Sequence, residues 1–444
     1  MMHYDVAVIG GGIAGYTAAI RSLQAGKKTV LISQGQSALH FSSGSIDVLA
    51  KLPDGSPVTH PFDALEALKQ QAPLHPYNAV GRTTLQKGLE WFRHTLAAAN
   101  VPLQHQDDLA NHGRITPLGT LKATWLSQPF VYQHRSEVPF ERIVVVSIDG
   151  YRDFQPQMLK DNLSQHPDFH AVPTHTVTLS IPGFDGYRRN PNELRSIDIA
   201  RLLKQEAAWT TLCDGLMRVA SRDGLVIMPA IMGNGDGLTL LTKLRAATQL
   251  RFHEVPTMPP SLLGIRIEEA LSRTFIQLGG IHLKGDKVVS GHFERNCLVS
   301  LQTQNLRDMP INAEHYIMAT GSYFSQGLHA EQHTITEPVF GLQVTHKPAR
   351  ADWRNPAFFA DRSHPFMAFG VDTNAQLNPT RNGEAVRNLY CCGSMLAGYD
   401  PVFEGCGGGV AIGTAYHAIM PCIQSINPQV SVSHSKPSDQ EVLA

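Results

Sequence analysis

The chain has 444 residues, 42% hydrophobic and 17% charged, which is typical of a globular protein with room for roughly two or three domains. Its net charge of -1 excludes a uniformly basic surface for nucleic acid. No apolar run reaches the roughly 18 residues that a spanning helix needs, and no signal peptide is recognisable, so we expect a cytoplasmic protein without a direct membrane span.

The chain begins with a predicted strand, turn, helix and second strand. The apolar run Asp5–Ile9 ends in Gly10-Gly-Gly12, and a helical pattern follows from Ile13 to a capping Gly26. Thr29–Ile32 then reads as a second buried strand. This order predicts a parallel βαβ unit.

The turn carries a dinucleotide fingerprint, with glycines at Gly10, Gly12 and Gly15. The first allows a tight turn, the second lets a phosphate approach the backbone, and the third lets helix and strand pack closely. The acid expected at the end of the second strand is missing, and Ser33 stands there instead. We therefore predict FMN, with FAD as the alternative, since FMN has no adenosine ribose to bind.

Small residues follow the second strand. Ser42, Ser43 and Gly44 suit a close approach of backbone to a flavin ring. His40, in the same stretch, is a candidate catalytic base, and a structural or flavin-contacting histidine is the alternative.

The middle of the chain mixes short strands, helices and loops. A helix is predicted within the range 260–279, and it carries Arg266 and Arg273. Residues seven apart share a helix face, so these arginines are candidate ligands for a substrate phosphate. The alternative is that they form ordinary surface salt bridges with Glu268, Glu269 or distant acids.

Near the C-terminus the strand-and-glycine pattern returns, which favours a flavin over a nicotinamide cofactor. One strand ends at Thr320 and Gly321, another at Gly393 and Ser394, and a glycine run then opens a helix, whose positive end could face a flavin. The candidate residues of that run are Gly407, Gly408 and Gly409.

These motifs predict an α/β fold: a Rossmann-like flavoprotein whose discontinuous flavin-binding domain comprises 1–85 and 300–424. An inserted α+β substrate or cap domain would occupy 86–299, and 425–444 would form a disordered tail. The six cysteines lack iron–sulfur or zinc spacing, so no metal site is predicted.

With these motifs placed, the sequence resembles the B subunits of the anaerobic glycerol-3-phosphate dehydrogenases. The resemblance covers nearly the whole chain. It is carried by the stretches Gly35–Ser45, Thr116–Leu121 with Thr124–Leu126, Pro259–Arg266 and Gly405–Val410.

The resemblance implies an FMN-binding subunit that works with an FAD-containing A subunit and a membrane-associated iron–sulfur C subunit. Such a complex oxidises sn-glycerol 3-phosphate to dihydroxyacetone phosphate and passes electrons to quinone, with fumarate or nitrate as terminal acceptor. The chain would then lie on the inner face of the cell membrane. An NAD-dependent soluble dehydrogenase and a non-catalytic scaffold subunit are the alternatives.

Overall fold

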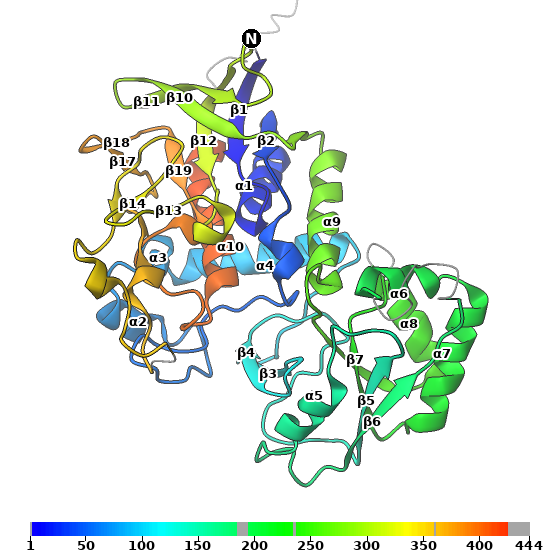
Figure 1. Cartoon of the computed structure of the whole chain (residues 1–444). Helices are drawn as coiled ribbons and strands as arrows, with labels where there is room; N and C mark the ends of the chain where they lie inside the picture. Colours follow the sequence, from blue (N-terminus) through cyan, green and yellow to red (C-terminus); the bar gives the residue numbers. More distant parts are fainter. Residues whose placement is uncertain (1, 184–193, 234–236, 359–360, 425–444) are drawn as a thin grey trace, which may run out of the picture.

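The computed structural model describes residues 2–183, 194–233, 237–358 and 361–424. The predicted disordered tail, 425–444, lies outside this part of the chain. Figure 1 shows two lobes: a larger one containing both the first and the last elements, and a smaller one formed by the middle of the chain.

The larger lobe is built on a mainly parallel sheet that joins distant parts of the sequence. Its order over the described residues is β10-β11-β12-β1-β2-β9, and β19 also pairs with β12. β1 pairs in parallel with β2 and β12, as the βαβ prediction requires, whereas β10 and β11 form an antiparallel flap. The bounds are β1 (Met2–Ile9), β2 (Thr29–Ser33), β9 (Ile281–Lys284), β10 (Val288–Glu294), β11 (Cys297–Thr303), β12 (Ile311–Met318) and β19 (Leu389–Cys391).

Helices cover this sheet and complete the larger core. α1 packs against both α9 and α10, and α10 packs in turn against α4. Both α1 and α10 start directly at glycine-rich turns, as the sequence predicted. The bounds are α1 (Ile13–Gln24), α2 (Leu65–Gln71), α3 (Pro76–Val80), α4 (Arg82–Ala98), α9 (Leu262–Gln277), α10 (Gly407–Ala418) and α11 (Met420–Gln424).

The smaller lobe has its own sheet and its own core. Its order is β6-β5-β7-β8, and all its described pairings are parallel. A separate cluster of buried apolar side chains, between Ile115 and Val255 in sequence, fills its interior. The bounds are β5 (Ile143–Ile148), α5 (Pro156–Leu163), β6 (Thr174–Leu179), α6 (Ser196–Leu202), α7 (Glu206–Val219), β7 (Leu225–Pro229), α8 (Gly237–Thr248) and β8 (Arg251–Val255).

The predicted α/β flavoprotein fold is confirmed, and two details of its division differ from expectation. The sheet of the smaller lobe is parallel and alternates with helices, so the insert is not of the segregated α+β kind. In addition, β9 and β10 precede residue 300 and β11 begins before it, yet all three strands belong to the larger sheet. Helix α4 also belongs to the larger core, although the predicted insert began at residue 86.

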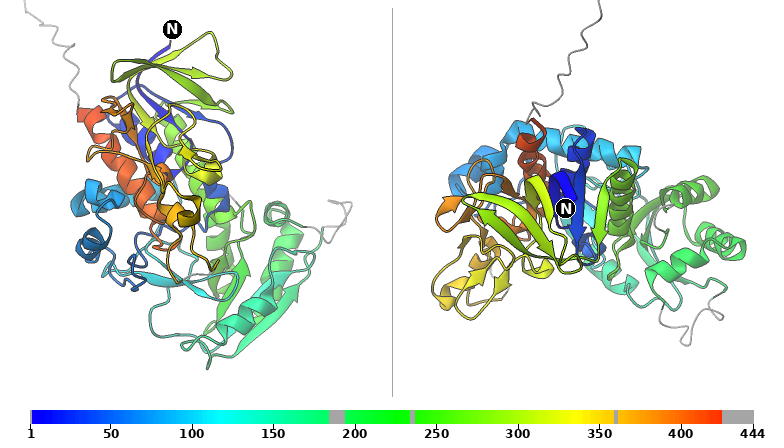
Figure 2. Two further views of the ribbon diagram at one scale, coloured as in Figure 1. Left: turned by 60° about the vertical axis from the view of Figure 1, so that its left-hand side comes forward. Right: turned by 90° about the horizontal axis from the view of Figure 1, so that it is seen from above.

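An antiparallel hairpin lies between the lobes. Its strands are β3 (His112–Ile115) and β4 (Leu121–Thr124). Figure 2 shows the same arrangement from two other sides, with the smaller lobe projecting from one flank of the larger. No helix in the described part of the chain combines the length and hydrophobicity needed to cross a membrane.

Candidate functional site

A cavity of about 1190 Å3 lies at the carboxyl ends of the parallel strands of the larger sheet. Residues that follow β1, β2, β12 and β19 form one side of it. The other side comes from the hairpin and the smaller lobe, through the ranges 116–122, 153–158 and 256–259. The cavity therefore lies between the two lobes, where α/β proteins commonly bind ligands.

The glycine turn at one end of the cavity has the predicted backbone geometry. Gly10 has a φ of 114°, a value that favours glycine. A Cβ built on Gly12 would have no atom within 4 Å, whereas one on Gly15 would overlap the carbonyl oxygen of Gly10. Gly12 thus leaves the cavity open at the start of α1, and Gly15 lets helix and strand pack closely. No side chain caps the helix, so its first backbone N–H groups are available to an anion.

Most of the predicted cofactor residues line this cavity. They are Gly10, Gly12, Ser33, Ser42, Ser43, Thr320, Gly321, Gly393, Ser394, Gly407 and Gly408. Gly15, Gly44 and Gly409 lie outside the lining and serve packing instead. A Cβ on Gly44 would press on Leu263, and one on Gly409 would overlap the hydroxyl of Tyr77.

Ser33, at the position where a ribose-binding acid was expected, has a protein partner. Its Oγ lies 2.8 Å from Nε2 of His282. Its side chain also limits the neighbouring turn, because a Cβ on Gly11 would lie 2.9 Å from the Cβ of Ser33. The end of β2 therefore presents a hydroxyl and not a carboxylate to the cavity.

The start of α10 forms part of the wall that the larger lobe contributes to the cavity. Gly407 and Gly408 line the cavity, and the backbone N–H of Gly409 donates to the carbonyl of Asp47 at 2.8 Å. This bond ties the segment after the serine stretch to the positive end of the helix.

His40 does not line the cavity. Its Nε2 lies 2.7 Å from Oε2 of Glu268 on α9, and its neighbours Leu39 and Phe41 face the cavity in its place. Burial raises the pKa of Glu268, and His40 opposes that rise. The position of His40 supports a structural role better than that of a catalytic base.

The two candidate phosphate arginines do not converge on the cavity, so that prediction is wrong in its geometry. Arg266 is 1% exposed and forms a two-pronged ion pair with Glu254, at 2.7 and 3.0 Å. Its remaining hydrogen bonds go to Gly233 and Gln128. Arg273 is exposed and lies 4.0 Å from Glu269. The first arginine holds the lobes together, and the second forms the surface pair considered as the alternative.

Three charged residues beside the cavity were not singled out from the sequence. Lys122 and Asp47 line it and form an ion pair with an Nζ–Oδ2 distance of 2.5 Å. Arg114 lies behind them, 2% exposed, and its Nη1 donates to Ser43 and Ser45. Arg114 and Lys122 flank the Thr116–Leu121 stretch, so that stretch was the feature of the sequence that could have pointed to these charged residues.

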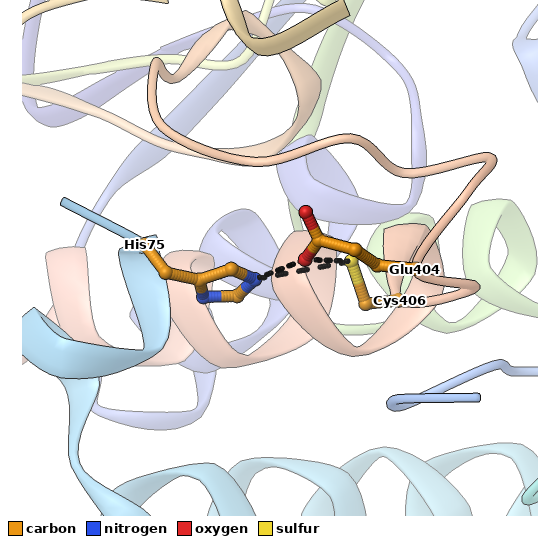
Figure 3. A group of neighbouring side chains, drawn as sticks. All are labelled: His75, Glu404 and Cys406. Atoms are coloured by element: carbon orange, nitrogen blue, oxygen red, sulfur yellow. Dashed lines mark hydrogen bonds and ion pairs between the residues drawn. The ribbon is translucent and has the colours of Figure 1, made fainter. Parts of the chain in front are cut away.

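A buried polar cluster precedes α10. Figure 3 shows His75, Glu404 and Cys406 side by side, each buried. Nε2 of His75 lies 3.2 Å from Glu404 Oε2, and the sulfur of Cys406 lies 3.8 Å from the same oxygen. Burial, reinforced by the Glu404 carboxylate, raises the pKa of the Cys406 thiol.

These three side chains have the residue types of a metal site, but their hydrogen bonds indicate another role. Nδ1 of His75 accepts the backbone N–H of Tyr77 at 3.0 Å, so the ring proton is on Nε2. That nitrogen then donates to Glu404, and a metal would have to displace its proton. The other oxygen of Glu404 accepts the N–H of Asp400 at 2.9 Å. The cluster therefore fixes the loop that leads into α10.

The glycine turn, the late return of the chain to the sheet and the cavity between two lobes define a flavin-binding protein of the oxidoreductase class. A family model described as an FAD binding domain matches residues 5–410. This match favours a flavin over a nicotinamide cofactor.

Relatives identify the family more closely. The chain is 68% identical to the anaerobic glycerol-3-phosphate dehydrogenase B subunit of Vibrio cholerae serotype O1, over 100% of both chains. It is 60% identical to the protein of the same name from Vibrio vulnificus, over 94% of this chain and 96% of that protein. The chain therefore belongs to the family of anaerobic glycerol-3-phosphate dehydrogenase B subunits.

A solved structure also aligns over most of the chain. It is a 3-ketosteroid-Δ4-(5α)-dehydrogenase from Rhodococcus jostii, with a TM-score of 0.42 and 10% identity, over 95% of this chain and 97% of that one. Likeness at this level adds nothing to the family assignment.

Proposed function

We propose that this chain is the FMN-binding subunit of a quinone-linked complex that oxidises sn-glycerol 3-phosphate to dihydroxyacetone phosphate. The observation that carries the proposal is the continuous cavity that runs from the Gly10–Gly12 turn to the start of α10 and the smaller lobe. Such a cavity suits a cofactor phosphate at one end and a small substrate at the other.

The residues of the cavity suit a flavin. The backbone at Gly12 and the uncapped start of α1 would hold the cofactor phosphate. Gly407 and Gly408 would set the positive end of α10 against the ring. The remaining lining glycines and small residues, Ser42, Ser43, Thr320, Gly321, Gly393 and Ser394, would allow close backbone contact with it. When bound, a flavin supplies the acceptor for a hydride from the carbinol carbon.

FMN is favoured over FAD by the end of β2. A carboxylate there would accept hydrogen bonds from an adenosine ribose, whereas the Ser33 hydroxyl is already paired with His282. The cavity continues past Ser33, so the size of the cavity does not favour FMN over the longer FAD.

We further propose the partners that the family resemblance implies. These are an FAD-containing A subunit and a membrane-associated iron–sulfur C subunit, with electrons passed to quinone and on to fumarate or nitrate. The complex would hold this chain at the inner face of the cell membrane.

Release of the cofactor tests the proposal. Purified protein is denatured, and the supernatant is separated by chromatography against FMN and FAD standards. We expect FMN in a stoichiometric amount. Stoichiometric FAD would overturn the choice of FMN, and protein isolated without any flavin would overturn the proposed function itself.

A further inference from the structure

The hairpin between the lobes brings two cations to one wall of the cavity. Arg114 on β3 pairs in register with Lys122 on β4, and directly opposed residues of an antiparallel pair project from the same face. Both side chains reach the segment 43–47. Arg114 donates to Ser43 and Ser45, and Lys122 pairs with Asp47.

Over the residues that the structure describes, the guanidinium group of Arg114 lacks hydrogen-bond partners for two of its nitrogens. Its Nη1 makes hydrogen bonds of 2.5 Å to the Ser43 carbonyl and 2.6 Å to the Ser45 hydroxyl. Its Nε and Nη2 are buried and have no hydrogen-bond partner among the described residues. Both acceptors are neutral, and no ion pair joins this guanidinium to a carboxylate in the described part of the chain. A buried arginine normally has such a partner.

The neighbouring carboxylates of Asp47 and Glu254 stabilise the charged form of Arg114, but each forms its ion pair with another cation. Glu254 is committed to Arg266 by two hydrogen bonds, and Asp47 is committed to Lys122. Three cations therefore face two carboxylates. Two nearby histidines respond to the excess charge, because burial first and Arg114 second lower the pKa of His112 to about 4 and that of His253 to about 3.

This excess of positive charge lies beside the part of the cavity that is shared by both lobes. Ser43, Ser45, Asp47 and Lys122 all line it, and Asp47 is tied through its carbonyl to the start of α10. Lys122 is about half exposed, at 51%, and an ammonium group that gives one donor to Asp47 keeps two more for a ligand.

We propose that Lys122, backed by Arg114, forms the subsite for the phosphate group of the substrate. Lys122 binds the dianion at the cavity wall. Arg114 is a positioning residue: it holds Ser43 and Ser45 in place and contributes positive potential from behind them. This assignment rests on the proposed function, since it places the substrate's carbinol carbon near the start of α10, where the flavin ring is expected.

Binding of phosphate to the flavin-loaded protein tests the subsite. Inorganic phosphate, glycerol 3-phosphate and glycerol are titrated calorimetrically at constant ionic strength into wild type, Lys122→Met and Lys160→Met. Lys160 lies on α5 and does not line the cavity, so its variant is a control with the same change of charge. We expect Lys122→Met to lower the affinity for inorganic phosphate and for glycerol 3-phosphate by about 10- to 100-fold, the range for loss of a charge-assisted hydrogen bond. The control should match wild type, and glycerol should bind weakly to all three.

Two variants of Arg114 separate the effect of its charge from a purely structural role. We expect Arg114→Met to weaken phosphate binding and Arg114→Lys to recover part of it, because lysine restores the charge but not the geometry. A purely structural role would leave the lysine variant as impaired as the methionine variant.

Several results would overturn the subsite. They are wild-type protein that binds no phosphate ligand, Lys122→Met that binds as wild type does, an equal loss in Lys160→Met, or an Arg114→Lys variant no better than Arg114→Met. Loss of flavin from Lys122→Met would assign the lysine to the cofactor and would also overturn it. If flavin is present and phosphate does not bind, the subsite fails alone; if flavin is absent from wild type, the proposed function fails.

Discussion

At the scale of single residues, the three glycines of the turn have different roles that mutation can separate. A Cβ on Gly12 meets no protein atom, and its extended backbone, with φ -85° and ψ -174°, accepts any side chain. Gly12→Val should therefore keep the fold and lose most of its flavin, because the valine occupies the place of the phosphate. Gly15→Ala should instead destabilise the protein by about 1–3 kcal/mol, since the methyl group overlaps the Gly10 carbonyl.

Flavin absorbance per protein and thermal unfolding of both variants check this pair. Normal flavin content in folded Gly12→Val protein would refute the phosphate-binding assignment. An unfolded Gly12→Val protein would show that the turn has a packing role that the open space around it does not suggest.

Arg266 offers a second contrast, between a buried and an exposed arginine on the same helix. Arg266→Met leaves Glu254 buried without a counter-ion, so we expect a loss of about 3–5 kcal/mol in the free energy of unfolding. Arg273→Met removes only an exposed pair and should change it by less than about 0.5 kcal/mol. Urea unfolding measures both. If Arg266→Met is as stable as wild type and its apparent KM for glycerol 3-phosphate rises, Arg266 binds the substrate phosphate after all.

Local patterns predicted the glycine turn better than they predicted the charged residues. The tight turn at Gly10 and the close packing of Gly15 on it arise within the first strand and helix, so the spacing of the glycines is enough to predict them. The partner of Arg266 is Glu254 on β8, in another lobe, and helix periodicity contains no information about it. Lys122 and Asp47 meet only when the hairpin folds onto the segment 43–47, so neither residue was recognisable alone.

At the scale of elements, the start of α10 depends on the loop before it. Glu404 accepts the Nε2–H of His75 and the backbone N–H of Asp400. In Glu404→Gln one carboxylate oxygen becomes an NH2 group, which is a donor and therefore faces the donor of either His75 or Asp400. We expect the free energy of unfolding to fall by about 1.5–3 kcal/mol, the range for hydrogen bonds to charged groups. Flavin binding should also weaken, because Gly407 and Gly408 follow this loop directly in the chain.

Thermal unfolding and flavin titration of Glu404→Gln measure these effects, with the exposed Glu384→Gln as the control. Both measurements are repeated on wild type after treatment with a chelator, which should change neither the Tm nor the flavin affinity. Stoichiometric zinc in wild type that is removed together with stability would mean that the cluster binds a metal.

The order of elements was predictable because strong local signals mark it. Glycines follow β1 and open α10, and the apolar run that forms β2 matches its predicted range closely. Strand pairing was less accessible. β9 and β10 read as part of the insert, and only their pairing with β2 and β11 places them in the larger sheet. Pairing between strands so far apart in sequence leaves no periodic trace in the chain.

At the scale of the whole molecule, the two lobes have separate cores and are joined by buried polar contacts. Arg266 on α9 reaches Glu254 on β8, and Gln128 bonds the carbonyls of Gly44 and Leu263. The cavity is therefore shaped by polar contacts as well as by apolar packing. A change of protonation near the junction should affect the smaller lobe before the larger one.

Acid should destabilise the smaller lobe through His253. Tyr132 donates its N–H to Nδ1, and Nε2 donates to the carbonyl of Ile115, so this ring is held neutral. Burial lowers its pKa to about 3 from the ordinary value of 6.5. The unfolded chain takes up the proton first, so the stability from this group is complete above about pH 6.5 and falls as the pH drops toward 3. His112, with a pKa lowered to about 4, acts in the same direction.

Urea unfolding at pH 7.5, 6 and 5 measures this dependence, and hydrogen exchange locates it. We expect the free energy of unfolding to fall by on the order of a few kcal/mol between pH 7.5 and pH 5. As the pH is lowered, hydrogen exchange should become faster in β7 and β8 before it does so in β1 and β12. His253→Gln should be less stable at pH 7.5 but lose less on acidification, because its amide does not titrate, whereas the exposed His94→Gln should follow wild type. If His253→Gln has the same pH slope as wild type, the acid response arises elsewhere, and His253 is ruled out as its cause.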